Sequence, residues 1–448
     1  MAEVVKVGRE GSALSLISDW DTLGAALQVR PQILAYALSH REELARRITL
    51  KKGRVVFKSS PSLQFIQLRI AMLASRLVEE LPEKEVILAY RKGVQPVQEI
   101  SGYAGCHTFI TTDVRSFFPS ITLQHIAFSL EKSGMTKAGA KLVGRYGIAR
   151  YTREIPCEAI EHAELGENAV LVLKGGRRVT ASSMGAHLEK WRNGTLHAVR
   201  SYHALQQGSP ASSALSNLVG YYYIDEKILA YLRGLGVYDN GDVVYRRYCD
   251  NIALFCRRDM GPEFYQNFRR FLTEEMAKSG FSLHSWNSIR NNARNRNQAF
   301  LGVVLNHDAR VEKRMIDSLR ALFLNTCMHG FASQYARFLE VQGGETRMHA
   351  ARFALAGEST GETRMHGILR GKISYVGSVN KTHGAWLTKL YNAAVKIDAY
   401  VKGALGHEEK LRRLQKRESK ELFSLLKLYR KKEGLSEYLE RIDAFIAA

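Results

Sequence analysis

The sequence has few cysteines, and they lack the spacing that zinc and redox motifs use. Five cysteines occur among 448 residues, and no two of them form a CxxC motif. This argues against a zinc ribbon and a disulfide framework, and it fits a reducing cytoplasm. No run of about 18 apolar residues is present, so a membrane span is not expected. The N-terminal stretch contains no apolar core typical of a secretory signal.

Acidic residues are also scarce relative to basic ones. The chain has 65 Lys and Arg against 44 Asp and Glu, which gives a formal net charge of +21. Such an excess attracts polyanions, and nucleic acid is the commonest of these. A protein that is merely basic and soluble has the same composition, so charge alone predicts neither a fold nor a reaction.

The hydrophobic periodicity predicts an α+β protein with two or three subdomains. Helices are expected over residues 13–50, 62–81 and 264–280, and strands over 54–59, 109–114 and 252–257. Beyond about residue 312 strands become scarce and basic, helical segments dominate. These patterns predict an N-terminal helical region (1–45), a mixed region (46–310) and a helical region (311–448).

Two carboxylates stand in contexts that suit nucleotidyl transfer, a reaction that uses two divalent cations about 4 Å apart. Asp113 ends the apolar stretch FITTDV, and Asp250 lies in YCDN between two β-prone stretches, where a hairpin turn is expected. Hard cations prefer oxygen ligands, so carboxylates that converge from neighbouring strands form the minimum site. Either one alone is weak evidence, since an Asp at a strand end is usually a turn former.

The segment LQQGSPASSALSNL, residues 205–218, lies between the two carboxylates. Gly208 and Pro210 indicate a loop, and Ser212 or Ser213 is expected to cap the helix that follows. A backbone turn beside a helix N-terminus can approach a nucleotide closely. Taken alone, the segment also fits an ordinary capped loop.

In this order, the segments resemble the motifs of reverse transcriptases. DVRSFFPSI resembles motif A, QGSPASSALSNL motif B, YCDN the YxDD of motif C, and FLGVVLN the primer grip of motif E. Residues 53–70 and 89–94 resemble the fingers, and residues 368–380 the thumb, of the bacterial retron and group II intron-like branch. The resemblance spans roughly residues 46–380 and is strongest to the stand-alone, defence-associated (anti-phage) enzymes.

This resemblance implies a right-hand polymerase of α+β class. Its fingers and palm, an antiparallel sheet packed on helices, would occupy residues 46–310, with the fingers mainly at 46–108 and 125–200. A basic, all-helical thumb and C-terminal extension would follow at 311–448. The implied activity is RNA-directed addition of dNTPs by two-metal nucleotidyl transfer with Mg²⁺ or Mn²⁺. Implied partners are a structured noncoding RNA and a DNA product in anti-phage defence, with a homo-oligomer or partner subunit also open and no membrane.

Residue roles follow from the matched positions. The implied catalytic residues are Asp113, Asp250 and Asn251. The implied metal ligands are Asp113, the backbone carbonyl of Val114, and Asp250. The implied dNTP contacts are Phe118, Gln207, Gly208, Arg54 and Lys58. The implied primer and template contacts are Tyr248, Cys249, Phe300, Leu301 and Gly302. Phe118 would be the steric gate against ribose, with a plain core residue as the alternative, and Arg54 and Lys58 also fit solvated strand positions.

The sequence departs from the family pattern in several places. Asn251 replaces the second aspartate of motif C, so either the enzyme is active with an altered metal preference or the site is degenerate and structural. Asn287 or a neighbour stands where motif D usually has lysine, and substitution by His284 or Arg290 stays open. Two alternatives to polymerase activity in defence therefore remain, a retron-type enzyme that makes RNA-linked DNA and an inert RNA-binding scaffold.

Other segments fall outside the motifs. Residues 165–195 predict an inserted hairpin around Gly175-Gly176, and GETRMH occurs at both 344–349 and 361–366. Each is either a surface elaboration or a nucleic-acid or partner contact. The basic stretch 407–434 is interpreted equally well as a phosphate-binding helix or as a solvated one.

Overall fold

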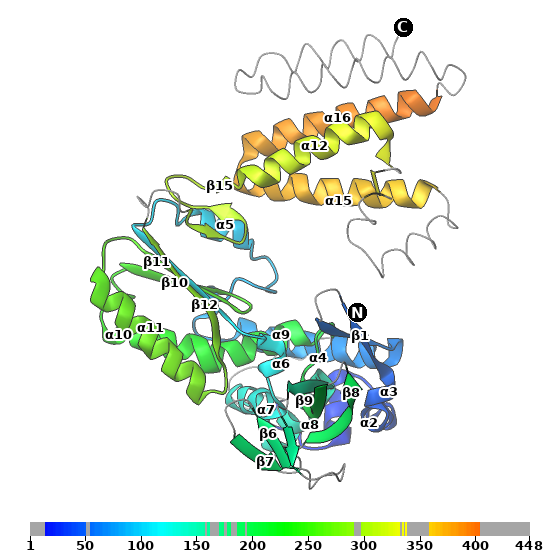
Figure 1. Cartoon of the computed structure of the whole chain (residues 1–448), viewed down its shortest axis with the longest axis vertical. Helices are drawn as coiled ribbons and strands as arrows, with labels where there is room; N and C mark the ends of the chain where they lie inside the picture. The colour runs from blue at the N-terminus through cyan, green and yellow to red at the C-terminus, as the bar shows by residue number, and fades with distance from the viewer. Residues whose placement is uncertain are drawn as a thin grey trace. The chain divides into compact units, whose positions relative to one another are not determined.

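The computed structural model describes most of the chain. It covers residues 14–50, 54–156, 159–161, 170–173, 177–180, 186–192, 195–290, 297–331, 334–335, 337 and 358–403, with the backbone alone between 153 and 201. The chain forms two compact units, Met1–Val94 with Phe109–Ser288, and Gln95–Thr108 with Ile289–Ala448. Helices and antiparallel strands occur in both, which confirms the α+β class (Figure 1). The naming of fingers, palm and thumb stays a prediction.

A four-stranded sheet forms the centre of the first unit, in the order β10-β11-β3-β12. Its strands are β10 (Val243–Tyr248), β11 (Asn251–Cys256), β3 (Thr108–Val114) and β12 (Leu283–Arg290). Every residue of β11 from Ile252 to Cys256 is buried, because helices cover the sheet. The two strands predicted around the carboxylates are therefore neighbours in one sheet.

Helices α10 (Glu226–Gly234) and α11 (Gly261–Lys278) lie beside this sheet (Figure 1). Tyr231 of α10 stacks on Phe271 of α11 with ring centroids 4.1 Å apart. Phe268 of α11 lies 5.8 Å from Trp286 of β12. These aromatic contacts join the helical layer to the edge of the sheet.

The N-terminal part is less helical than expected. Helices α1 (Trp20–Leu27), α2 (Pro31–Ser39) and α3 (Arg41–Leu44) precede strand β1 (Ala45–Thr49), which pairs antiparallel with β2 (Val55–Ser59). The prediction of helix up to residue 50 is wrong for Ala45–Thr49, because the ladder with β2 satisfies this backbone instead. Helix α4 (Pro61–Glu79), which Ser60 caps, confirms the predicted helix and buries Leu63, Ile66 and Ile70.

The long spacing between Asp113 and Gln207 contains more strands than predicted. Helices α7 (Leu123–Lys132) and α8 (Lys137–Gly147) are followed by two three-stranded antiparallel sheets. One contains β4 (Ile148–Pro156), β9 (Thr195–Leu205) and β8 (Ala186–Arg192), and the other β5 (Ala159–Glu161), β6 (Val170–Leu173) and β7 (Arg177–Thr180). Strands β6 and β7 pair as the expected hairpin, while Gly175 and Gly176 lie outside the described residues.

The second unit has a small sheet and long helices. The sheet consists of β13 (Ala299–Phe300), β14 (Val303–Val304) and β15 (Arg310–Val311). The unit also contains α5 (Pro96–Ser101), α12 (Lys313–His329), α15 (Glu358–Val379) and α16 (Lys381–Gly403). A separate core that includes Phe323, Leu369 and Leu387 holds the long helices together. The helical character expected beyond residue 312 is confirmed where the structure describes it.

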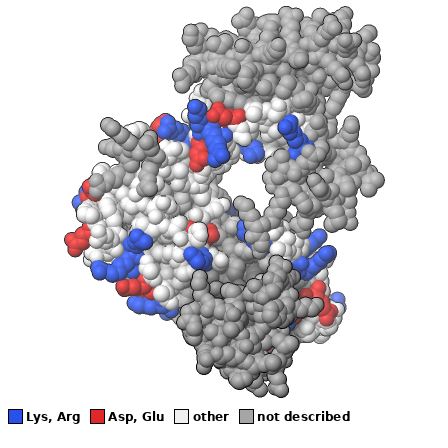
Figure 2. All heavy atoms as spheres, in the orientation of Figure 1, with Lys and Arg blue, Asp and Glu red and all other residues white. Residues whose placement is uncertain are grey.

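Two sequence features lie partly or wholly beyond the described residues. The second GETRMH copy lies in α15, where Met365 is fully buried, and the first copy is outside the described residues. The basic stretch 407–434 is outside them too. Elsewhere, Figure 2 shows Lys and Arg in separate groups on the visible face. None of the described helices has the length and apolar content that a bilayer crossing requires.

Candidate active site

Asp250 lies in a tight, strained turn. Tyr248 pairs with Asn251 across β10 and β11, which leaves Cys249 and Asp250 as a two-residue hairpin loop. Cys249 has φ +58°, a left-handed conformation that costs a residue with a side chain about 1–2 kcal/mol. The predicted hairpin is therefore confirmed, and its backbone needs support from its surroundings.

The side chain of Arg247 supports the backbone of this turn. Its fully buried guanidinium donates through Nη1 to the Cys249 carbonyl at 3.0 Å, and through Nε and Nη2 to the Asp225 carboxylate at 2.7 and 2.8 Å. Asp225 ends the π-helix η3 (Tyr221–Asp225) and also accepts from the Tyr245 hydroxyl at 2.5 Å. Burial by itself lowers the pKa of Arg247, but the Asp225 carboxylate outweighs it and raises that pKa, so the guanidinium stays charged.

The sheet order brings the second carboxylate beside the first. Val114, the residue after Asp113 on β3, donates its N–H to the Asp250 carbonyl at 3.0 Å. Burial raises the pKa of Asp250, and the negative charge of Asp113 raises it further. Asp113, at the end of β3, and Asp250, in the β10–β11 turn, therefore lie close enough for their charges to interact.

Two side chains of β12 contact Asp113 directly. The Ser285 hydroxyl donates to Asp113 Oδ1 at 2.5 Å, and His284 Nδ1 lies 3.4 Å from Asp113 Oδ2. His284 is largely exposed and stays open as a substitute for the missing lysine, whereas Ser285 was not predicted. Asn287 lies exposed on the same strand, and the side chain of Arg290 is outside the described residues.

Asn251 contacts the Asp250 carboxylate with its amide nitrogen. Its Nδ2 donates to Asp250 Oδ1 at 3.0 Å. In this rotamer the side chain supports Asp250 and does not present an oxygen beside it. Within the described ranges, no three His, Cys, Asp or Glu residues form a metal-binding group.

The donor set nevertheless fits a divalent cation. Burial and the nearby negative charge of Asp113 raise the free energy of the charged form of Asp250, and a hard cation would offset both effects. Each oxygen of Asp113 also keeps a lone pair beyond its contact with β12.

The loop of residues 206–211 is held against β2 by a buried polar cluster. Gln206 donates to the Ser59 hydroxyl at 2.8 Å and accepts from Gln67 at 3.0 Å, and Ser59 donates to Gln67 at 2.7 Å. The Gln207 carbonyl accepts from the Phe57 N–H at 2.7 Å. This network fixes the backbone of the loop to β2 and α4.

Gly208 is required by the same close approach. It has φ +100°, and a Cβ there would lie 2.5 Å from the Phe57 carbonyl oxygen. The expected capping by Ser212 or Ser213 is wrong, because α9 (Ser212–Gly220) has Ala211 at its N-cap without a side-chain bond. The Ser212 hydroxyl donates instead to the Gln206 carbonyl, which stabilises the loop rather than the helix end.

A cavity of about 1190 Å³ opens between these elements. Six of the predicted site residues line it: Arg54, Phe118, Gln207, Tyr248, Cys249 and Asp250. Burial dominates and raises the pKa of Asp250, and the positive charge of Arg54 partly opposes that rise, so the two residues lie near each other. Lys58 is exposed on β2 and does not line the cavity.

The two phenylalanines of α6 (Phe117–Ser120) differ in burial. Phe117 is 2% exposed and packs on Phe281 with ring centroids 5.8 Å apart. Phe118 is half-buried and faces the cavity. The arrangement separates a core aromatic from one that can contact a ligand.

The remaining predicted contacts belong to the second unit. Phe300 ends β13, and Leu301 and Gly302 form the two-residue turn to β14 with φ of +50° and +80°. Both positive values match a type I′ hairpin turn. Tyr375 of α15 donates its hydroxyl to the Leu301 carbonyl at 2.7 Å, which holds the turn against the helix.

Sequence reasoning missed Arg247, Asp225 and Ser285. For Arg247 a signal was present, since it alternates with Val243 and Tyr245 along VVYRRY and therefore shares their buried face. Asp225 and Ser285 come from distant segments, and nothing local in the sequence indicates their partners.

Comparisons with known proteins add to this geometry. No protein-family model matches the sequence. The retron Mx162 reverse transcriptase of Myxococcus xanthus is 21% identical over 285 residues, covering 61% of this chain and 50% of that protein. The chain therefore spans about half the length of the curated relative it matches.

Among solved structures, the fold resembles telomerases only distantly. Candida albicans telomerase, solved with a TWJ fragment of telomeric RNA, gives a TM-score of 0.38 and 12% identity over 83% of this chain and 66% of that one. Apo telomerase of Candida tropicalis gives 0.36 and 11% over 82% and 68%. The chain is similar in sequence to part of a retron reverse transcriptase.

Proposed function

We propose that this protein is a reverse transcriptase, an RNA-directed DNA polymerase with a right-hand fold. The observation that carries the proposal is the approach of Asp113, on β3, to Asp250, in the β10–β11 turn, where Asp250 lines a cavity together with Arg54, Phe118 and Gln207. The ordered motif resemblance and the similarity to a retron reverse transcriptase support it.

Asp113, Asp250 and the backbone carbonyl of Val114 would hold Mg²⁺ or Mn²⁺. When bound, two such ions supply charge stabilisation at the attacking and leaving oxygens of a phosphoryl transfer. The protein's own part is positional. Ser285 fixes one oxygen of Asp113, Arg247 holds the turn that carries Asp250, and Arg54 offers positive charge to a triphosphate.

Substrate choice would follow from Phe118 and Gln207. The bulky Phe118 side chain lines the cavity, where it would exclude a ribose 2′-hydroxyl and so favour dNTPs. The Gln207 carbonyl accepts from the Phe57 N–H, and the Gln207 N–H donates to the Tyr151 hydroxyl at 3.0 Å. These two bonds fix the backbone from which the Gln207 side chain extends. Tyr248 and Cys249 would contact the primer, with Phe300, Leu301 and Gly302 as the primer grip.

The biological setting is inferred from the resemblance. A structured noncoding RNA and a DNA product are the proposed partners in anti-phage defence, and the net charge of +21 favours such polyanions. The cysteine usage favours a reducing compartment such as the cytoplasm. A homo-oligomer or partner subunit stays a hypothesis.

The test is incorporation of labelled dNTP on a primed RNA template. Wild type should extend the primer, and Asp113→Asn should not. Asp239→Asn, which changes an exposed carboxylate in the loop before β10, is the matched control and should extend as wild type does. Extension by Asp113→Asn at the wild-type rate would refute the proposal.

Two rival functions have specific support. The similarity to a retron enzyme favours synthesis of RNA-linked DNA, which predicts a covalent RNA–DNA product that ribonuclease shortens. The amide at Asn251 favours an inert RNA-binding scaffold, which predicts no incorporation with Mg²⁺ or Mn²⁺ even at high enzyme concentration. Sequencing the nucleic acid that co-purifies with the protein separates all three.

A further inference from the structure

A second cavity, of about 830 Å³, lies between α4 and the loop that carries Tyr90. Its walls are mainly apolar and include Leu14, Leu68, Met72 and Leu77. Leu68 and Met72 are 48% and 51% exposed, although both lie on a helix whose other face is core. A cavity of this volume falls in the range of sites for small ligands or single groups of larger ones.

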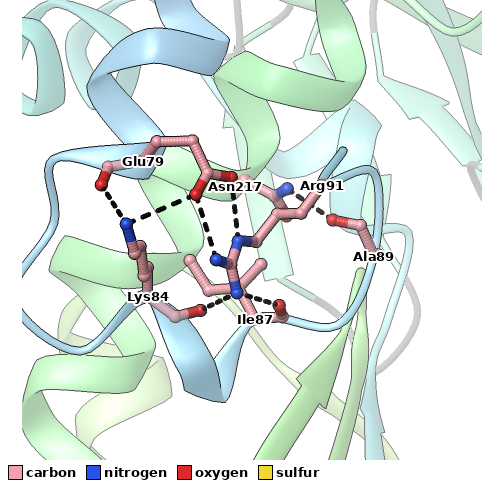
Figure 3. Close-up of polar contacts among 6 residues, drawn as sticks. All are labelled: Glu79, Lys84, Ile87, Ala89, Arg91 and Asn217. Carbon is pink, nitrogen blue, oxygen red and sulfur yellow. Dashed lines mark hydrogen bonds and ion pairs between the residues drawn. The ribbon is translucent and has the colours of Figure 1, made fainter. Parts of the chain in front are cut away.

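The wall formed by α9 contains a buried hydrogen-bond acceptor. Asn217 is 1% exposed and donates through Nδ2 to the Ala89 carbonyl at 2.8 Å (Figure 3). Its Oδ1 accepts no hydrogen bond from any residue that the structure describes. A buried acceptor without a partner is costly, so this oxygen favours a ligand that brings an N–H or O–H group.

The loop opposite α4 is rigid before any ligand arrives. Arg91 donates to both oxygens of Glu79 at 3.0 and 3.1 Å, and to the carbonyls of Lys84 and Ile87 at 2.7 and 3.2 Å (Figure 3). Together with the Asn217–Ala89 bond, these contacts hold the loop on α4 and α9. A preorganised wall lowers the entropy cost of binding.

Tyr90 joins this cavity to the catalytic one. It lines both cavities, is 51% exposed, and lies with its ring centroid 6.3 Å from that of Tyr248. Its φ of +59° is unusual for an aromatic residue and marks a backbone held in place by its surroundings. Tyr90 is therefore a wall that the two cavities share, and a strand that passes it on leaving the catalytic cavity would lie beside the second one.

The second cavity is lined by more basic than acidic side chains, which favours a polyanion. The basic residues are Arg76, Arg91 and Lys92, and the acidic ones are Glu79 and Glu80. Arg91 and Lys84 pair with Glu79, the latter at 3.5 Å, so the repulsion from that carboxylate is reduced. Apolar walls, an exposed aromatic ring and nearby cations are the features with which proteins bind single-stranded nucleic acid.

We propose that this cavity binds an unpaired base of the template strand ahead of the catalytic cavity, with Asn217 Oδ1 accepting a hydrogen bond from the base. The inference rests on the proposed polymerase function. Every nucleobase has a flat face for the wall formed by Leu68 and Met72, and each has an N–H group for Asn217 when unpaired. A purely apolar protein side chain would leave the Asn217 oxygen unpaired.

The test measures the affinity of the full chain for a primer annealed to an RNA template, with and without a single-stranded template overhang. Met72→Glu places a negative charge on the cavity wall at an exposed position. Phe65→Glu is the matched control, since Phe65 is 47% exposed on the same helix and lies outside the cavity lining. Fluorescence anisotropy gives both affinities, and thermal melting verifies that each variant is folded.

We expect Met72→Glu to lower the affinity for the overhang substrate about tenfold, as loss of one stacked base does. Affinity for the blunt duplex and all affinities of Phe65→Glu should stay within about twofold of wild type. Equal losses on both substrates, or none on either, would overturn the inference. A protein partner of the cavity would give no overhang-specific loss.

A scan of abasic template positions makes the test specific to a base. One abasic position in the overhang should weaken wild-type binding about tenfold and should not weaken Met72→Glu further, because both changes remove the same contact. Additive losses at every position would contradict the inference. If wild type neither binds nor extends primed RNA, the proposed function itself fails; normal extension with an unaffected Met72→Glu rejects only the template-base site.

Discussion

At the scale of single residues, a buried ion pair supports the turn that carries Asp250. Arg247 and Asp225 are both fully buried, and Arg247 also binds the carbonyl of the strained Cys249. Replacing one member of a buried pair leaves an uncompensated charge. This lowers the free energy of unfolding much more than replacing both members does. The pair therefore couples the stability of the unit to the position of Asp250.

Replacing Arg247 alone should be strongly destabilising. Arg247→Met leaves the Asp225 carboxylate buried without its partner and should lower the free energy of unfolding by about 3–5 kcal/mol. The double variant Asp225→Asn/Arg247→Met should recover more than half of that loss, since the amide introduced at position 225 brings no charge. Urea denaturation of the wild type, both single variants and the double variant measures the coupling. Additive losses would show that the two side chains act independently.

Ser285 gives a second residue-scale prediction, this time on rate. Ser285→Ala removes the hydrogen bond to Asp113 Oδ1 and should lower kcat for dNTP incorporation about tenfold, as expected for a hydrogen bond to a charged group. Affinity for the primed template should not change. Ser285→Thr keeps a hydroxyl and should retain most of the rate. A threonine variant as slow as the alanine variant would argue against positioning by the hydroxyl.

At the scale of elements, the first turn of α7 contains a titratable cap. Thr122 donates its N–H to His125 Nδ1 at 3.1 Å, and the His125 N–H donates to the Thr122 hydroxyl at 3.4 Å. This reciprocal pair is a capping box. It needs a neutral imidazole, because a protonated Nδ1 cannot accept. Burial against Phe281 and α11 lowers the pKa of His125 below its ordinary 6.5.

This lowered pKa predicts a loss of stability in acid. The unfolded chain binds a proton at His125 near 6.5 while the folded chain resists it, so the free energy of unfolding falls as the pH drops below 6.5 and levels off below the folded-state pKa. His125→Gln keeps the capping box without a titrating group and should flatten this part of the pH profile. His307→Gln, at an exposed position, should leave the profile unchanged. Equal profiles for wild type and His125→Gln would contradict the account.

The elements also show how far the sequence predicts the structure. Strand β3, the β10–β11 hairpin and α4 follow from local patterns that agree with their tertiary surroundings. Strand β1 was missed because its pairing with β2 overrides a helical local pattern. The Ser212 hydroxyl was misassigned because its acceptor, the Gln206 carbonyl, depends on a loop conformation set by β2. Likewise, the contact of Ser285 with Asp113 exists only once β12 pairs beside β3.

At the scale of the whole molecule, the chain combines a strong positive charge with a proposed metal site that has one carboxylate fewer than the family pattern. The net charge of +21 favours binding of nucleic acid, whereas Asn251 brings no negative charge to the proposed metal site. We therefore expect tight binding of nucleic acid together with weak binding of Mg²⁺. Metal dependence is the property in which this molecule should differ most from enzymes with two adjacent aspartates.

Primer extension on an RNA template as a function of Mg²⁺ and Mn²⁺ concentration tests this most directly. We predict that wild type extends the primer with both ions. Asp250→Asn should extend it at least about a thousandfold more slowly with either ion. Asn251→Asp should reach half-maximal extension at a lower Mg²⁺ concentration than wild type, because it restores a third carboxylate. Extension by Asp250→Asn at the wild-type rate would contradict the central role of the Asp113 and Asp250 pair.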